Sequence, residues 1–68
     1  MKRVKVQVVK RIETKRYSLT LGQATSGLYY IQYVNAKDEN KDFVTDSMED
    51  LNIALYVFDL KYAEFEGN

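Results

Sequence analysis

Cysteine, histidine, proline and tryptophan are absent from this chain of 68 residues, and glycine occurs only three times. Without cysteine the protein has no disulfide, and without cysteine and histidine it lacks the commonest zinc ligands. The same absences remove the usual nucleophile and the usual general base of catalysis near neutral pH. The glycines stand too far apart to form a phosphate-binding loop. We therefore predict that the protein is not an enzyme, and that it has no catalytic residues and no cofactor.

A long hydrophobic run is also missing. Lys5, Gln7 and Lys10 interrupt the apolar run that follows the basic N-terminus, whereas a signal peptide needs at least about seven consecutive apolar residues. No stretch reaches the roughly 18 apolar residues of a membrane span. Hydrophobic residues nevertheless make up 46% of the chain, which favours a folded core over disorder. These features predict a soluble, cytoplasmic protein with no membrane partner, and so small a domain leaves little room for a small-molecule substrate.

Alternating apolar and polar residues predict a β-sheet in the first two thirds of the chain. The ranges 3–12, 16–22 and 28–35 are typical of strands, and 42–45 is a short fourth candidate. The side chains expected to point toward the core are Val4, Val6, Val8, Tyr17, Leu19, Leu21, Tyr29, Ile31 and Tyr33. Val9 breaks the alternation of the first strand, which indicates a bulge or the end of the strand.

A helix is predicted over 47–65, with Asp46 and Ser47 as suitable N-caps. Its main apolar stripe follows helical spacings of three and four residues. The stripe consists of Met48, Leu51, Leu55, Phe58, Tyr62 and Phe65. The whole pattern predicts one α+β domain over 1–68, in which a three- or four-stranded antiparallel β-meander carries one C-terminal α-helix packed on one face.

The back of this helix carries a second set of apolar residues. These are Ile53, Tyr56, Val57 and Leu60. The back of a helix that covers a sheet is normally polar, so the second set predicts a contact surface for another protein or for a second copy of the chain. This is the favoured functional hypothesis: a small non-catalytic binding protein that acts as a protein-interaction or self-associating module, with a homodimer as one form.

Charge along the chain is segregated. Residues 1–16 hold seven of the ten basic residues and one of the ten acidic residues, so the two parts of the chain carry about +6 and −6. A basic patch of this kind can attract a polyanion even when the net charge is zero. The alternative hypothesis is therefore a nucleic-acid-binding module that uses the outer face of the sheet. Its residues are Arg3, Lys5, Gln7, Arg16 and Tyr30.

Five oxygen-bearing residues match the spacing of a calcium-binding EF-hand loop. They are Asp38, Asn40, Asp42, Asp46 and Glu49. The loop would need glycine at its sixth position, where this chain has Phe43, and the preceding segment is typical of a strand instead of a helix. We therefore interpret these residues as an acidic loop followed by helix-capping acids, and predict no metal site.

Overall fold

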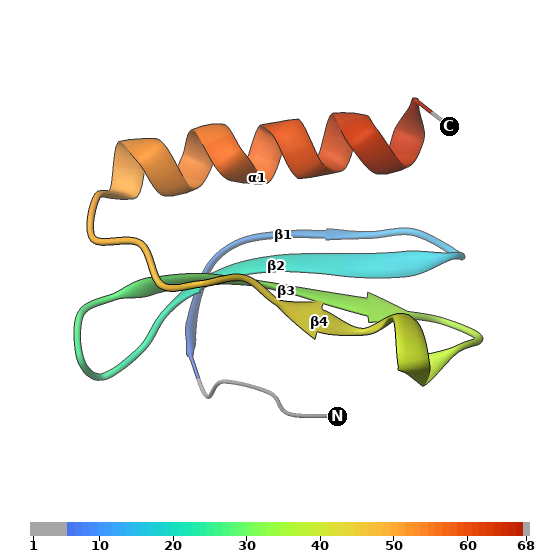
Figure 1. Cartoon of the computed structure of the whole chain (residues 1–68), viewed down its shortest axis with the longest axis horizontal. Coiled ribbons are helices and arrows are strands. Elements are labelled where there is room, and N and C mark those ends of the chain that lie inside the picture. The colour runs from blue at the N-terminus through green and yellow to red at the C-terminus, as the bar shows by residue number, and fades with distance from the viewer. Residues whose placement is uncertain (1–5, 68) are drawn as a thin grey trace.

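The computed structural model describes residues 6–67, which form an antiparallel sheet and one helix (Figure 1). The strands are β1 (Gln7–Glu13), β2 (Tyr17–Gln23), β3 (Tyr29–Asn35) and β4 (Phe43–Val44), and a short 3-10 turn, η1 (Glu39–Lys41), precedes β4. The strand order in the sheet is β1-β2-β3-β4 and each neighbouring pair is antiparallel. The helix α1 (Leu51–Glu66) packs on one face of the sheet. The predicted α+β meander with a C-terminal helix is confirmed, and the sheet has four strands.

Of the two alternatives predicted at Val9, a bulge or the end of the strand, the first strand contains a bulge. Its pairing with β2 shifts between Val8 and Lys10, so Val8 lies opposite Gly22 while Lys10 lies opposite Leu21. Paired residues of neighbouring strands point to the same face of a sheet. Lys10 therefore shares the helix side with Leu21, and Val8 lies on the outer face, where it is 56% exposed. The prediction that Val8 points into the core is wrong, because the bulge reverses the alternation along β1.

Because Gly22 has no side chain, it leaves room for Val6, the residue just before β1. A Cβ atom at Gly22 would collide with the side chain of Val6 and would lie 3.2 Å from the carbonyl oxygen of Gln7. Val6 therefore covers the outer face of β2 at this point instead of pointing toward the helix as predicted. Val4 lies outside the described residues. Glycine is required here by the close approach of the two strands.

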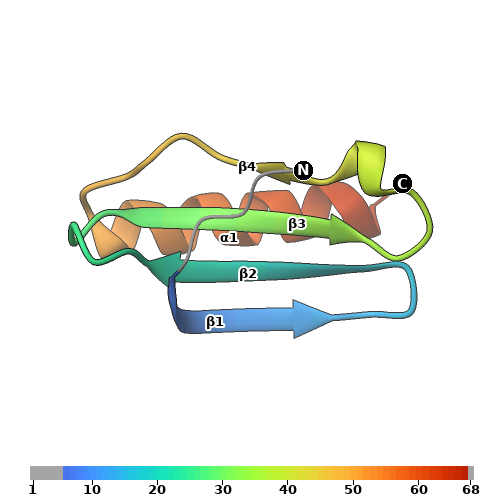
Figure 2. The ribbon, with the colours of Figure 1, turned by 90° about the horizontal axis from the view of Figure 1, so that it is seen from below.

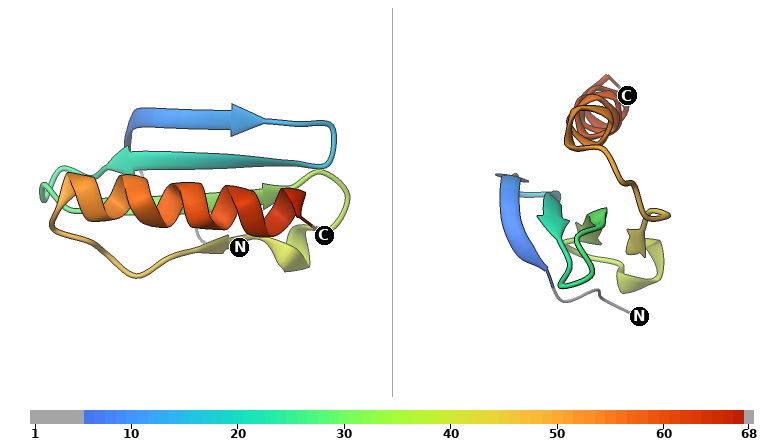
Figure 3. Two further views of the ribbon diagram at one scale, coloured as in Figure 1. Left: turned by 90° about the horizontal axis from the view of Figure 1, so that it is seen from above. Right: turned by 90° about the vertical axis from the view of Figure 1, so that its left-hand side faces the viewer.

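The core lies between α1 and the two central strands. Among residues 6–67 the buried hydrophobic residues are Tyr17, Leu19, Leu21, Ile31, Tyr33, Ala54 and Phe58. The predicted inward positions on β2 and β3 are thus confirmed, with Tyr29 only partly buried against the cluster. Seen from above and from the end, the helix lies over the central strands and leaves β1 at an open edge (Figure 3). Nearly all of β1 is accordingly exposed.

The helix begins four residues later than predicted. Met48 and Tyr29 exchange two backbone hydrogen bonds, of 2.8 and 2.9 Å, which hold the chain extended beside β3. Asp50 then caps the helix, because its carboxylate accepts hydrogen bonds from the backbone N–H groups of Asn52 and Ile53. The prediction of Asp46 or Ser47 as the cap is wrong, because Met48, which follows them, is extended and pairs with Tyr29 of β3.

The buried stripe of α1 is also rotated relative to the prediction. Ala54 and Phe58 are fully buried, whereas Leu51 and Tyr62 remain 38% and 37% exposed. Leu55 and Phe65 pack partly against the core as expected. Alanine at position 54 lets the helix backbone approach the sheet closely, and so small a residue gives only a weak signal in a hydrophobicity pattern.

Candidate protein-interaction surface

Three large apolar side chains lie exposed on the back of α1. Ile53 is 56% exposed, Tyr56 is 65% exposed and Leu60 is 51% exposed. At about 100° per residue they fall within an arc of roughly 60° on the helix circumference, opposite Phe58. We call these three residues the helix strip. The end-on view shows that one side of the helix packs on the sheet while the other side is not covered by any strand (Figure 3).

Val57 lies at the margin of the helix strip. Its side chain is partly buried against the core cluster, so it does not stand on the exposed surface with the other three residues predicted there. The structure therefore brings together Ile53, Tyr56 and Leu60, and places Val57 between that surface and the core. Helical periodicity alone puts Val57 close to the division between the two faces, and only the position of the helix on the sheet decides its burial.

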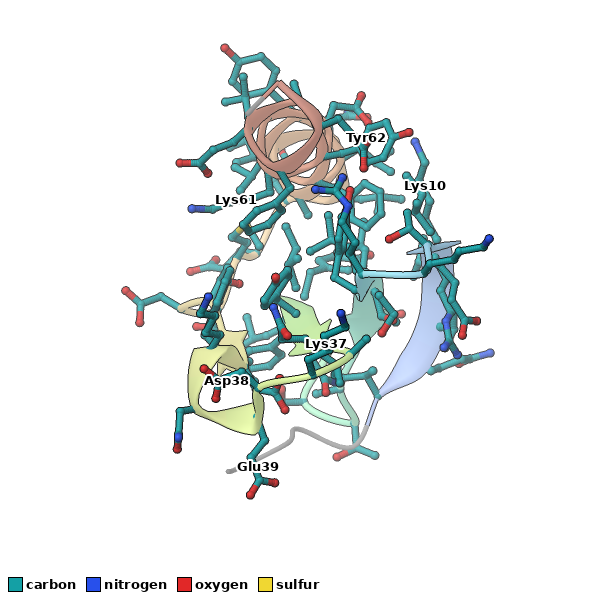
Figure 4. All side chains as sticks on the ribbon, turned by 90° about the vertical axis from the view of Figure 1, so that its right-hand side faces the viewer. Lys10, Lys37, Asp38, Glu39, Lys61 and Tyr62 are labelled. Atoms are coloured by element: carbon teal, nitrogen blue, oxygen red, sulfur yellow. The ribbon has the colours of Figure 1, made fainter. Side chains whose placement is uncertain are left out.

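Acidic residues flank the helix strip. Asp59 lies on the side of β1, where its carboxylate is 3.3 Å from the amino group of Lys10. Glu64 lies on the other side and its carboxylate is 3.7 Å from the amino group of Lys61. Figure 4 shows Lys10 and Tyr62 on one side of the helix and Lys61 on the other. Both ion pairs are solvent-exposed and so contribute little stability.

The C-terminal end of α1 is fixed to β2 by a polar contact. The hydroxyl of Tyr17 donates a hydrogen bond of 2.6 Å to a carboxylate oxygen of Glu66, and the guanidinium of Arg16 lies 3.2 Å from the same oxygen. Burial of Tyr17, together with its hydrogen bond to Glu66 and the negative charge of that carboxylate, raises the pKa of the phenol from 10.0 to about 12. The contact orients the last turn of the helix and hence the end of the helix strip.

The raised pKa of Tyr17 predicts a loss of stability in alkali. A phenol whose pKa is higher in the folded state than in the unfolded state stabilises the fold below the unfolded pKa, and this contribution disappears as the pH rises through the folded pKa. We expect the extra stability to be intact below pH 10 and to fall between about pH 10 and about pH 12. Unfolding midpoints of the wild type and of Tyr17→Phe, measured across this range, would check it. Parallel pH profiles for the two proteins would contradict the assignment.

The residues predicted for nucleic-acid binding do not share one surface. Arg3 and Lys5 lie outside the described residues. Gln7 pairs with Gln23, two residues from the buried Leu21, and so belongs to the helix side of β1. Arg16 sits in the turn after β1 and reaches Glu66 on the helix. Of the described set, only Tyr30, which pairs with Gly22, lies on the outer face of the sheet.

The outer face instead presents a different basic residue. Arg11 pairs with Thr20 and lies on this face, where its guanidinium is 3.2 Å from the carboxylate of Glu13. Figure 2 views the sheet from below, with β1 at its edge. Simple alternation also places Arg11 on the outer face, whereas the bulge moves Gln7 from the predicted outer face to the helix side. Three other basic residues, Arg16, Lys37 and Lys41, line a hollow of about 310 Å³. The acidic side chain of Asp38 lines the same hollow, so its wall is not uniformly basic.

Two of the residues with calcium-loop spacing, Asp38 and Asp42, bind backbone N–H groups through their carboxylates. Asp38 accepts a hydrogen bond from the N–H of Asn40, and Asp42 accepts one of 2.6 Å from the N–H of Asn35. In the part of the chain that the structure describes, no group of three or more aspartate, glutamate, histidine or cysteine side chains could hold a metal ion. Asp38 and Asp42 therefore order the loop between β3 and β4.

Comparison with known protein families, curated proteins and solved structures found no match for this chain. No helix among residues 6–67 has both the length and the apolarity that crossing a membrane requires. The functional argument therefore rests on the surfaces described above, of which the helix strip has the largest exposed apolar side chains.

Proposed function

We propose that this protein is a small non-catalytic interaction module that self-associates through the helix strip. The observation that supports the proposal is the exposure of Ile53, Tyr56 and Leu60 side by side on the free face of α1. Single exposed apolar residues are common on protein surfaces, whereas a contiguous set of large ones is typical of an interface. Val57 and the flanking Asp59 and Glu64 form the margins of the contact.

Self-association would also add stability to a domain whose hydrophobic core is small. Among the described residues the buried core has only seven hydrophobic side chains, and no disulfide supplements them because the chain has no cysteine. Domains this small are marginally stable, and oligomerisation is one of the usual remedies. Burial of apolar surface contributes roughly 25 cal/mol per Å², so covering the helix strip adds stability that the single chain lacks.

Replacing Leu60 by glutamate tests the proposal. We expect the wild type to show a mass that rises with concentration between about 10 µM and about 1 mM in analytical ultracentrifugation, because a small apolar surface gives weak to moderate affinity. Leu60→Glu should remain at the monomer mass of 8.0 kDa, because association would bury an unpaired charge.

The matched control is Thr25→Glu, which adds the same charge at an exposed position of the turn between β2 and β3. It should self-associate like the wild type. Leu60 is half exposed, so its replacement should leave the circular dichroism and the unfolding midpoint of the monomer nearly unchanged. A wild type that stays monomeric over the whole range, or a Leu60→Glu variant that associates normally, would exclude the proposed function.

A further inference from the structure

Charge is unevenly distributed along α1. The first half of the helix, Leu51–Phe58, carries no charged side chain. The charged residues of the second half are Asp59, Lys61, Glu64 and Glu66. The helix strip crosses both halves, because Ile53 and Tyr56 lie in the first half and Leu60 lies in the second. The relative direction of two paired helices therefore decides whether their charged halves face each other.

We infer that two copies pair their helix strips antiparallel, about a two-fold axis that passes beside Tyr56. The inference rests on the proposed function and states how the second copy is oriented. In this arrangement Ile53 of each copy packs against Leu60 of the other copy, and the two Tyr56 rings meet near the axis. The charged half of each helix then lies beside the uncharged half of the other helix.

A parallel arrangement would place each charged residue beside its own counterpart. Asp59 and Glu64 already form ion pairs within the chain, with Lys10 and Lys61, so these acids do not attract a second copy. Packing identical ion pairs against each other would remove water from them without a new partner, which costs energy. Antiparallel helices avoid this cost, and the negative end of each helix dipole then lies toward the positive end of the other.

The position of α1 allows two copies to approach in this way. The helix is the outermost layer of the described chain, and all four strands lie on its other side (Figures 1 and 3). No strand therefore stands between the helix strips of two approaching copies. The contact is isologous, because both copies use the same surface and each copy has one helix strip. Such a contact closes at the dimer and leaves no helix strip for a third copy.

Disulfide crosslinking tests the arrangement, because the chain has no cysteine and an introduced one is its only thiol. A disulfide requires Cα atoms within about 7 Å of each other. Tyr56→Cys, close to the two-fold axis, should form a covalent dimer when oxidised glutathione is added. Ile53→Cys and Leu60→Cys should each form little covalent dimer alone, because identical positions then lie about 10 Å apart along the helices. Mixed together, these two variants should crosslink to each other.

Thr25→Cys, which is exposed in the turn between β2 and β3, is the control for random collision. Tyr56→Cys should crosslink several-fold faster than this control, and the wild type should not exceed twice the monomer mass of 8.0 kDa in ultracentrifugation. Fast crosslinking of Ile53→Cys with itself and of Leu60→Cys with itself would show parallel helices. A mass above that of a dimer would show a contact that does not close. Either result would overturn the inference.

The masses of the wild type and of Leu60→Glu judge the proposed function separately. If the wild type associates and Leu60→Glu does not, but no cysteine variant of the helix strip crosslinks faster than Thr25→Cys, the proposed function stands and the antiparallel arrangement fails. If Leu60→Glu associates normally, or if the wild type is monomeric at all concentrations and gains mass only with a different protein, both fail.

Discussion

Replacing Phe58 by alanine should destabilise the protein by about 3–5 kcal/mol, as large-to-small changes of a buried phenylalanine usually do. Phe58 has no exposed surface and lies in the centre of the contact between α1 and the sheet. At roughly 0.05–0.15 kcal/mol per residue, the total stability of a chain of 68 residues is about 3–10 kcal/mol. The loss is therefore comparable with the whole stability, and we expect a large share of the variant to be unfolded at room temperature.

Urea unfolding followed by circular dichroism measures this effect, because the unfolding free energy falls linearly with urea concentration. Tyr56→Ala on the same helix is the control, since Tyr56 is 65% exposed. Its unfolding free energy should stay within about 0.5 kcal/mol of that of the wild type when measured on the monomer. Equal midpoints for Phe58→Ala and Tyr56→Ala would show that the helix does not pack on the sheet as described.

The second large effect is expected from Phe65→Ala, at about 2–4 kcal/mol, because a partly buried phenylalanine and its ring contacts are lost together. The ring of Phe65 lies 4.5 Å from that of Tyr33, 5.4 Å from that of Tyr17 and 6.2 Å from that of Phe43, measured between centroids. It thus joins the last turn of α1 to three strands. Without it, the last helical turn is held mainly by the contact of Glu66 with Tyr17 and Arg16.

Two measurements separate this role from a general loss of packing. Phe65→Leu keeps most of the apolar volume and loses only the ring contacts, so its destabilisation should be about 1 kcal/mol. Amide hydrogen exchange should show that Phe65→Ala opens residues near the C-terminal end of α1 more than those near Asp50. Uniform exchange along the helix, or equal losses for the two variants, would contradict the role of the aromatic cluster.

Local patterns were sufficient to predict the central strands. Tyr17, Leu19 and Leu21 alternate with polar residues, and all three are buried. The interruption at Val9 correctly predicted an irregularity in β1, and the exposed side chains of Ile53, Tyr56 and Leu60 follow from helical spacing. In each case the deciding information lies within about one turn of helix or one strand of the chain, where spacing along the sequence fixes the direction of a side chain.

The predictions that failed depend on segments that are distant in the sequence. Pairing with β2 decides which face Val8 occupies, since a shift of one residue in register moves a side chain to the other face of the sheet. Hydrogen bonds to Tyr29 keep Met48 extended and delay the start of α1. The contact with Glu66, fifty residues along the chain, withdraws Arg16 from the surface predicted for nucleic acid.

The sequence by itself determined the fold class of this protein and the division of its charge, because these follow from composition and short-range periodicity. Only the tertiary structure decided how the surfaces are composed: Val57 lies at the margin of the helix strip, Val8 and Val9 are exposed on β1, and Arg11 lies on the outer face in place of Gln7 and Arg16. These arrangements depend on strand register and on the rotation of α1 over the sheet. Both depend on contacts between segments that are far apart in the sequence, which no local pattern specifies.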